Sequence, residues 1–162
     1  MNRRLDRIDC QLLDILQKEA RLSNKELAAR VGLAPSTCLE RVRRLGQEGF
    51  LEGFHAEVNP KALGIQVQAL ISVRLGQHSR TSFREFRRHL LAQQEVSTVF
   101  QVGGKHDFLA HVVVRDTDHL RDFALDQVAS RPEVDHIETS LIFDLHRHPA
   151  LPNYLAEEDS SA

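Results

Sequence analysis

The feature that most constrains the fold of this sequence is the segment from Ser23 to Phe50, which reads SNKELAARVGLAPSTCLERVRRLGQEGF. Ser23 and Glu26 have the S-x-x-E spacing of a capping box, which satisfies free N–H groups at a helix start. Gly32 can take the positive φ that ends this helix, and Pro35 suits the first position of another. The segment therefore predicts two helices joined by a tight turn.

The second of these helices has a pattern that suits DNA. Four apolar residues keep helical spacing and are expected to face inward, namely Cys38, Leu39, Val42 and Leu45. The residues that we predict to contact DNA are Ser36, Thr37, Glu40, Arg41, Arg43 and Arg44, with Arg41 and Arg44 expected on the outward face. Arg can contact phosphates or guanine edges, and Ser or Thr can contact either phosphate or base. The segment therefore predicts a helix-turn-helix whose second helix enters the major groove of double-stranded DNA.

A solvated helix face is the alternative interpretation, because arginines are common on protein surfaces. The capping box, the Gly turn, the Pro start and the arginines occur together and in order, and this combination favours DNA binding. The whole chain has a net charge of −2, so a DNA contact must come from a local patch such as residues 41–44.

Composition narrows the class of protein further. No apolar run approaches the length of a membrane span, and the first ten residues have no apolar core of a secretion signal. Cys10 and Cys38 each lie within a helical pattern, so we predict small core residues rather than a disulfide. These features together lead us to expect a cytoplasmic protein. The length of 162 residues allows one ordinary domain or two small ones.

The chain divides into two patterns. Residues 6–20 predict a first helix with Asp6 as its N-cap, which completes a three-helix unit. Residues 50–58 alternate well enough for a strand or wing. We predict a winged helix-turn-helix domain at residues 1–52, a linker strand at 53–65, a second domain at 66–148 and a tail at 149–162, with an acidic, disordered end from Ala156.

The second half alternates between strand and helix patterns. Strands are predicted at residues 66–75, 96–102, 107–115 and 134–145, and helices at 79–93 and 117–130. This β-α-β-β-α-β order predicts a ferredoxin-like domain, in which two helices cover one face of a four-stranded antiparallel sheet, so the fold class is α+β. Apolar strand residues include Ile71, Val73, Val112, Val114, Leu141 and Phe143. We therefore expect another subunit to cover the bare face.

The sequence resembles the Lrp/AsnC family of prokaryotic transcription factors, the leucine-responsive and asparagine regulators. The matching motifs are LDRID at residues 5–9, NKELA at 24–28, VGLAPS at 31–36, LERVRRL at 39–45 and GKHDF at 104–108, the last resembling the family's G-x-x-D-aromatic signature. One departure is Ala34, where many relatives have a Ser that caps the recognition helix. Another is the basic pair Lys105-His106.

The resemblance implies a ferredoxin-like domain that senses an amino acid or related small metabolite. Family members typically dimerise through their sheets, assemble further into tetramers or octamers, and bind effectors between sensing domains. The effector-binding residues that it implies are Gly103, Gly104, Asp107, Thr139, Ser140 and Leu141. Glycine lets backbone N–H groups approach a carboxylate, and an Asp can pair with an α-ammonium. The alternative is that Gly103 and Gly104 form only a turn, which Asp107 caps.

Other chemistries have less support. His146 and His148 invite a metal interpretation, but zinc sites usually need three or four ligands and no C-x-x-C or H-E-x-x-H motif occurs. We therefore expect no metal and no other cofactor. A ferredoxin-like enzyme or an assembly module without DNA regulation is the alternative function. No nucleophile motif or phosphate loop supports an enzyme, and an assembly module does not explain the helix-turn-helix. We predict a non-enzymatic DNA-binding transcriptional regulator whose assembly and DNA binding respond to an amino acid or related metabolite.

Overall fold

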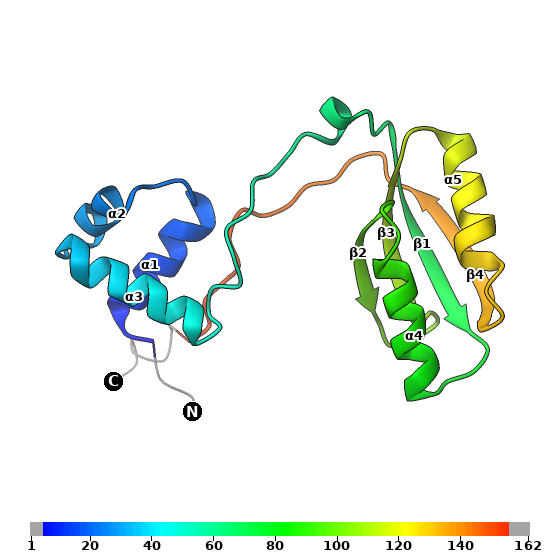
Figure 1. The fold of residues 1–162 in the computed structure, drawn as a ribbon, viewed down its shortest axis with the longest axis horizontal. Helices are drawn as coiled ribbons and strands as arrows, with labels where there is room; N and C mark the ends of the chain where they lie inside the picture. Colours follow the sequence, from blue (N-terminus) through cyan, green and yellow to red (C-terminus); the bar gives the residue numbers. More distant parts are fainter. Residues whose placement is uncertain (1–4, 156–162) are drawn as a thin grey trace. The chain divides into compact units, whose positions relative to one another are not determined.

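The computed structural model describes residues 5–155, which form two compact units. The N-terminal unit comprises residues 5–57 together with 146–155, and the second unit comprises residues 58–145 (Figure 1). The segment from His146 therefore belongs with the N-terminal helices, and its Leu151 N–H donates to Gln17 Oε1 at 2.7 Å. The acidic end predicted from Ala156 lies outside the described residues.

The N-terminal unit contains the three expected helices, α1 (Arg7–Lys18), α2 (Asn24–Val31) and α3 (Pro35–Gln47). Asp6 caps α1 and Ser23 caps α2, each in a reciprocal capping box. Gly32 ends α2 with a φ of 69°, a left-handed conformation that suits glycine. Ala34 is the N-cap of α3 and provides no side-chain hydrogen bond. The unit's core is made by Leu5, Leu12, Leu16, Leu27, Ala28, Val31, Cys38 and Leu45.

The strand or wing predicted at residues 50–58 is absent from the single chain. Residues 51–59 have no regular secondary structure, and a short 3-10 helix, Pro60–Leu63, follows them. A strand needs a neighbour for its N–H and C=O groups. Within residues 5–155, the one sheet contains only strands of the second unit, so this alternating segment has no strand to pair with.

The second unit has the predicted β-α-β-β-α-β order. Its elements are β1 (Val67–Leu75), α4 (Arg80–Leu91), β2 (Val96–Gln101), β3 (Phe108–Val114), α5 (Thr117–Phe123), a π-helical continuation (Ala124–Ala129) and β4 (Val134–Leu141). The antiparallel strand order is β2-β3-β1-β4. Strand β4 ends earlier than the predicted residue 145, because Leu141 already pairs with Ala69 near the start of β1.

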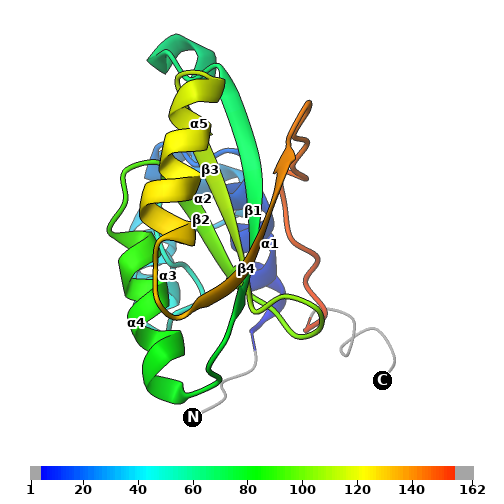
Figure 2. The ribbon, with the colours of Figure 1, turned by 90° about the vertical axis from the view of Figure 1, so that its right-hand side faces the viewer.

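Helices α4 and α5 lie on the same side of the sheet (Figure 2). Their buried Phe86, Leu90 and Phe123 pack in one core with the inward residues of the strands. That core contains Ile71, Val73, Val112 and Val114, so these four residues are covered by the chain's own helices and need no partner. Of the six apolar strand residues named from the sequence, Leu141 and Phe143 remain exposed. The strand pattern alone did not show which face the helices cover.

The opposite face of the sheet is bare and partly apolar. The strand register places Leu70, Leu109 and Val113 on the face opposite Ile71, together with Phe100, which is 50% exposed. At its centre, His111 is 7% exposed and its ring nitrogens lie 2.7 Å from Ser97 Oγ and 2.9 Å from Gln68 Oε1. The open face is therefore an apolar surface around a hydrogen-bonded polar cluster.

Candidate DNA interface and effector site

Four side chains form the exposed face of α3. Ser36, Thr37, Glu40 and Arg43 are all exposed, and their spacing puts them on one side of the helix. Within the described part of the chain, none of the four side chains makes a hydrogen bond or an ion pair. Their donors and acceptors are therefore available to an external partner, as a recognition surface requires.

Arg41 and Arg44 do not face freely outward, contrary to our expectation. Arg41 Nη1 contacts the carboxylates of Asp6 and Asp9, the latter at 2.8 Å, and Arg44 Nη2 lies 2.9 and 3.0 Å from the two oxygens of Asp9. Asp9 is almost completely buried, with a side chain only 3% exposed, and the two arginine side chains are about a quarter exposed. Both arginines thus hold α3 against the first turn of α1.

The electrostatics of this cluster agree with its geometry. Burial raises the pKa of the Asp6 carboxyl, but hydrogen bonds from the Arg41 guanidinium and the Asp9 backbone outweigh burial and lower this pKa below its ordinary value of 3.8. The hydrogen bonds from Arg41 to Asp6 and Asp9 in turn raise the pKa of Arg41. Asp6 and Arg41 therefore both remain charged at neutral pH.

Sequence reasoning did not predict that Asp6 and Asp9 form ion pairs with the arginines of α3. Their D-x-x-D spacing could have identified the capping box at the start of α1, but not a contact with a helix more than thirty residues later. Leu39 was also misplaced, since it is 39% exposed rather than inward. It lies at the edge of the apolar stripe, where spacing alone does not decide burial.

The loop between β2 and β3 contains the predicted effector residues Gly103, Gly104 and Asp107. Gly104 has a φ of 125°, which L side chains rarely adopt. The Asp107 carboxylate accepts from the Leu75 N–H at 2.8 Å and lies 3.2 Å from His78 Nε2. Asp107 therefore fixes this loop to the end of β1.

The other predicted effector residues, Thr139, Ser140 and Leu141, are exposed on the edge strand β4. They pair with Ile71, Leu70 and Ala69, whereas Asp107 lies at the Leu75 end of β1. The loop instead contacts β4 through Glu138, which lies 3.5 Å from Lys105 Nζ and 3.7 Å from His106 Nε2. A single chain thus separates the six predicted residues into two groups.

Among residues 5–155, no three His, Cys, Asp or Glu side chains gather as a metal site would require. No helix in that range is long and apolar enough to cross a membrane.

Comparison with known proteins agrees with both halves of the architecture. Residues 5–46 match the AsnC-type helix-turn-helix domain, and residues 68–149 match the Lrp/AsnC ligand binding domain. These matches define a helix-turn-helix transcriptional regulator with a ligand-binding domain. The chain belongs to the Lrp/AsnC family, whose related members here are regulators of transcription and not enzymes.

The similarity extends over nearly the whole chain. The chain is 41% identical over 150 residues to the HTH-type transcriptional regulator AldR of Mycolicibacterium smegmatis, and the match covers 93% of this chain and 87% of that protein. It is 34% identical over 140 residues to the leucine-responsive regulatory protein of Escherichia coli K12, covering 86% and 85%. A transcriptional regulator from Neisseria meningitidis, solved as a complex with L-Met, superposes with a TM-score of 0.84 at 31% identity, covering 91% and 96%.

The cluster around Asp9 generates a prediction about stability. Replacing Asp9 by Asn keeps the side-chain shape but leaves two arginines without their buried countercharge, so the N-terminal unit should lose about 3 kcal/mol. Urea denaturation of the full chain, followed by circular dichroism, measures the change. The matched control is Asp14→Asn, which removes an exposed i,i+4 pair with Lys18 and should have little effect. Equal stability of the two variants would contradict a structural role for Asp9.

Proposed function

We propose that this protein binds specific DNA sequences through the exposed face of α3, as a regulator of transcription in the cytoplasm. The observation that supports this most strongly is the set of four unpaired polar side chains, Ser36, Thr37, Glu40 and Arg43, on the second helix of a family helix-turn-helix. Arg43 is suited to a guanine edge or a phosphate, and Glu40 to the amino group of cytosine. Ser36 and Thr37, at the start of α3, are suited to phosphate or base.

Arg41 and Arg44 have a different part in this proposal. Their guanidinium groups already bind Asp6 and Asp9, so they position α3 rather than reading bases. This division assigns direct contact to four residues of the predicted set and positioning to the remaining two.

The experiment that tests DNA recognition replaces Arg43 by Ala. Operator affinity should fall about tenfold or more if Arg43 reads a base, with relaxed preference at one position, since such a contact contributes roughly 1–3 kcal/mol. If Arg43 binds phosphate, the salt dependence of binding should instead become shallower by about one unit. The measurement is fluorescence anisotropy on duplexes selected by the wild-type protein from a random pool.

The control for this experiment is Arg7→Ala, which removes the same charge from an exposed position on α1. If the Arg43→Ala variant kept full operator affinity and specificity, the Arg43 side chain would be excluded from the DNA interface. A wild-type protein that selects no duplex from the pool would exclude the proposed function itself.

We further propose that two copies of the chain associate through the open face of the sheet. Leu70, Leu109, Val113 and Phe100 form apolar surface there that α4 and α5 do not cover. Phe54 and Val58, each 54% exposed, lie in the alternating segment that lacks a strand partner. A second copy would cover the apolar residues of the open sheet face. It could also supply a strand partner for the segment that contains Phe54 and Val58, which supports a homodimer as the basic assembly.

Light scattering tests this assembly. The double variant Phe100→Ser/Leu109→Ser should shift the protein from dimer or larger species towards monomer at micromolar concentration, because it removes apolar area from the proposed contact. The control is Leu125→Ser, which removes a similarly exposed apolar side chain, 55% exposed, from the helical side. A monomeric wild-type protein, or unchanged assembly of the double variant, would contradict the proposal.

We propose that the effector is an amino acid or related metabolite bound at a contact between subunits. The loop containing Gly104 and Asp107 is attached to the Leu75 end of β1, whereas Thr139–Leu141 pair with residues 69–71 of that strand. In our proposal the site takes the loop from one copy and the strand from the other. Backbone N–H groups beside Gly103 and Gly104 suit a carboxylate, and the Asp107 carboxylate suits an ammonium group. The L-Met complex of the Neisseria meningitidis relative agrees with this ligand class.

Asp107→Asn separates the structural and ligand-binding roles of this residue. The amide oxygen can still accept from the Leu75 N–H, so the loop should remain in place, whereas the charge that attracts an ammonium group is lost. A thermal-shift screen of the amino acids should identify ligands that stabilise the wild-type protein, and the variant should lose most of that shift. An unchanged ligand shift in the variant would show that Asp107 is only a turn residue.

A further inference from the structure

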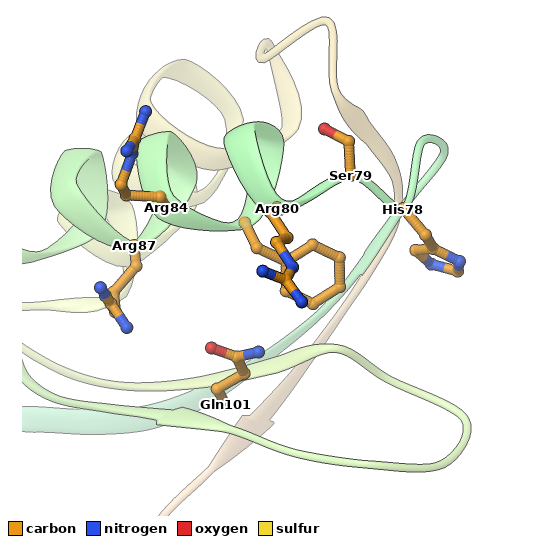
Figure 3. Close-up of a pocket in the computed structure, with 7 residues that line it drawn as sticks. His78, Ser79, Arg80, Arg84, Arg87 and Gln101 are labelled. Carbon is orange, nitrogen blue, oxygen red and sulfur yellow. The ribbon is translucent and has the colours of Figure 1, made fainter.

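A second candidate site lies on the helical side of the sensing unit. A cavity of about 380 Å³ is bounded by the N-terminal half of α4 and by β2, at the edge of the sheet. Figure 3 shows Arg80 and Arg87 pointing from α4 towards Gln101 of β2, whereas Arg84 points away from it. Two guanidinium groups and an amide therefore face one small hollow, and Phe83 and Arg84 also belong to its lining.

These arginines have no countercharge. Arg80, Arg84 and Arg87 form no ion pair within residues 5–155, and no carboxylate lines the cavity. Other arginines of the same unit are paired, including Arg74 with Asp135 and Arg121 with Asp118 and Asp122. Unpaired positive charge is thus concentrated on α4, where three of the arginines line the cavity.

Helical geometry explains why the charge gathers there. Arg80, Arg84 and Arg87 follow i, i+4, i+7 spacing and share one stripe of α4. Glu85 is the one acidic residue of the helix, and it lies roughly 100° around the axis from Arg84. The positive stripe is therefore not neutralised from within its own helix.

The cavity does not depend on the free N–H groups of the helix start. Ser79 caps α4, and its Oγ accepts from the Ser82 N–H at 3.0 Å. The His78 ring is directed to Asp107 Oδ2 at 3.2 Å. The donors left for a ligand are the guanidinium groups of Arg80 and Arg87 and the side-chain amide of Gln101.

We propose that this cavity binds a small molecule that carries two or more phosphate groups, such as a nucleotide. Guanidinium groups bind phosphate through paired N–H donors, and two that converge can hold neighbouring phosphates. The volume is within the range of small-molecule sites, and Phe83 offers an apolar surface to the rest of the ligand. The cavity borders the Gly103–Asp107 loop, since His78 of its lining lies 3.2 Å from Asp107 Oδ2. No residue of that loop lines the cavity, and its charged donors are cationic, so its ligand is distinct from the amino acid.

Isothermal titration calorimetry with sodium tripolyphosphate tests the proposal on the full chain without DNA or amino acid. The wild-type protein should bind tripolyphosphate saturably, and Arg80→Gln/Arg87→Gln should weaken this binding about tenfold or more, because the charge-assisted hydrogen bonds of both guanidinium groups are lost. The control, Arg88→Gln/Arg121→Gln, removes the same charge from exposed positions outside the cavity and should bind nearly as well as wild type.

Three results would overturn the proposal. The first is a lack of saturable tripolyphosphate binding by the wild-type protein, and the second is equal weakening in both double variants, which would reflect net charge alone. The third concerns duplex DNA, measured by fluorescence anisotropy. We expect Arg80→Gln/Arg87→Gln to bind duplex DNA as well as the control variant does. A selective loss of duplex affinity would assign the arginines to the DNA backbone instead of a small molecule.

Discussion

The helix-turn-helix depends on one buried carboxylate. Asp9 lies in the first turn of α1, and both Arg41 and Arg44 of α3 reach it. A charge so little exposed is tolerated only when partners surround it, so α1 and α3 must take one relative position for the unit to be stable. The orientation of the helix proposed to read DNA is thereby set by an interaction on its opposite side.

The sensing unit depends in a similar way on its central strand. Strand β1 pairs with both β3 and β4, and its inward residues form much of the core. The Asp107 carboxylate attaches the glycine loop to the end of this strand. A loop with two glycines is therefore attached to a strand that is paired on both sides, which suits the ligand site proposed there.

Features set by neighbouring residues could be predicted from the sequence. The N-cap at Asp6, the capping box at Ser23, the turn at Gly32 and the order of strands and helices all follow from local spacing, and the structure confirms them. The failures concern contacts between distant residues. The pairing of Arg41 with Asp9, the missing strand at residues 50–58 and the early end of β4 each depend on which partner lies opposite, which periodicity does not specify.

The separation of roles along α3 has a consequence for how such a regulator can change its target. Ser36, Thr37, Glu40 and Arg43 contact no core residue through hydrogen bonds or ion pairs within the described chain, so substitutions there leave the packing of the unit almost unaffected. Arg41 and Arg44 are their neighbours in the sequence but are bound to Asp9. If the four exposed positions read DNA as proposed, substitutions there can change the operator and keep the fold, whereas substitutions at Arg41 or Arg44 cost stability.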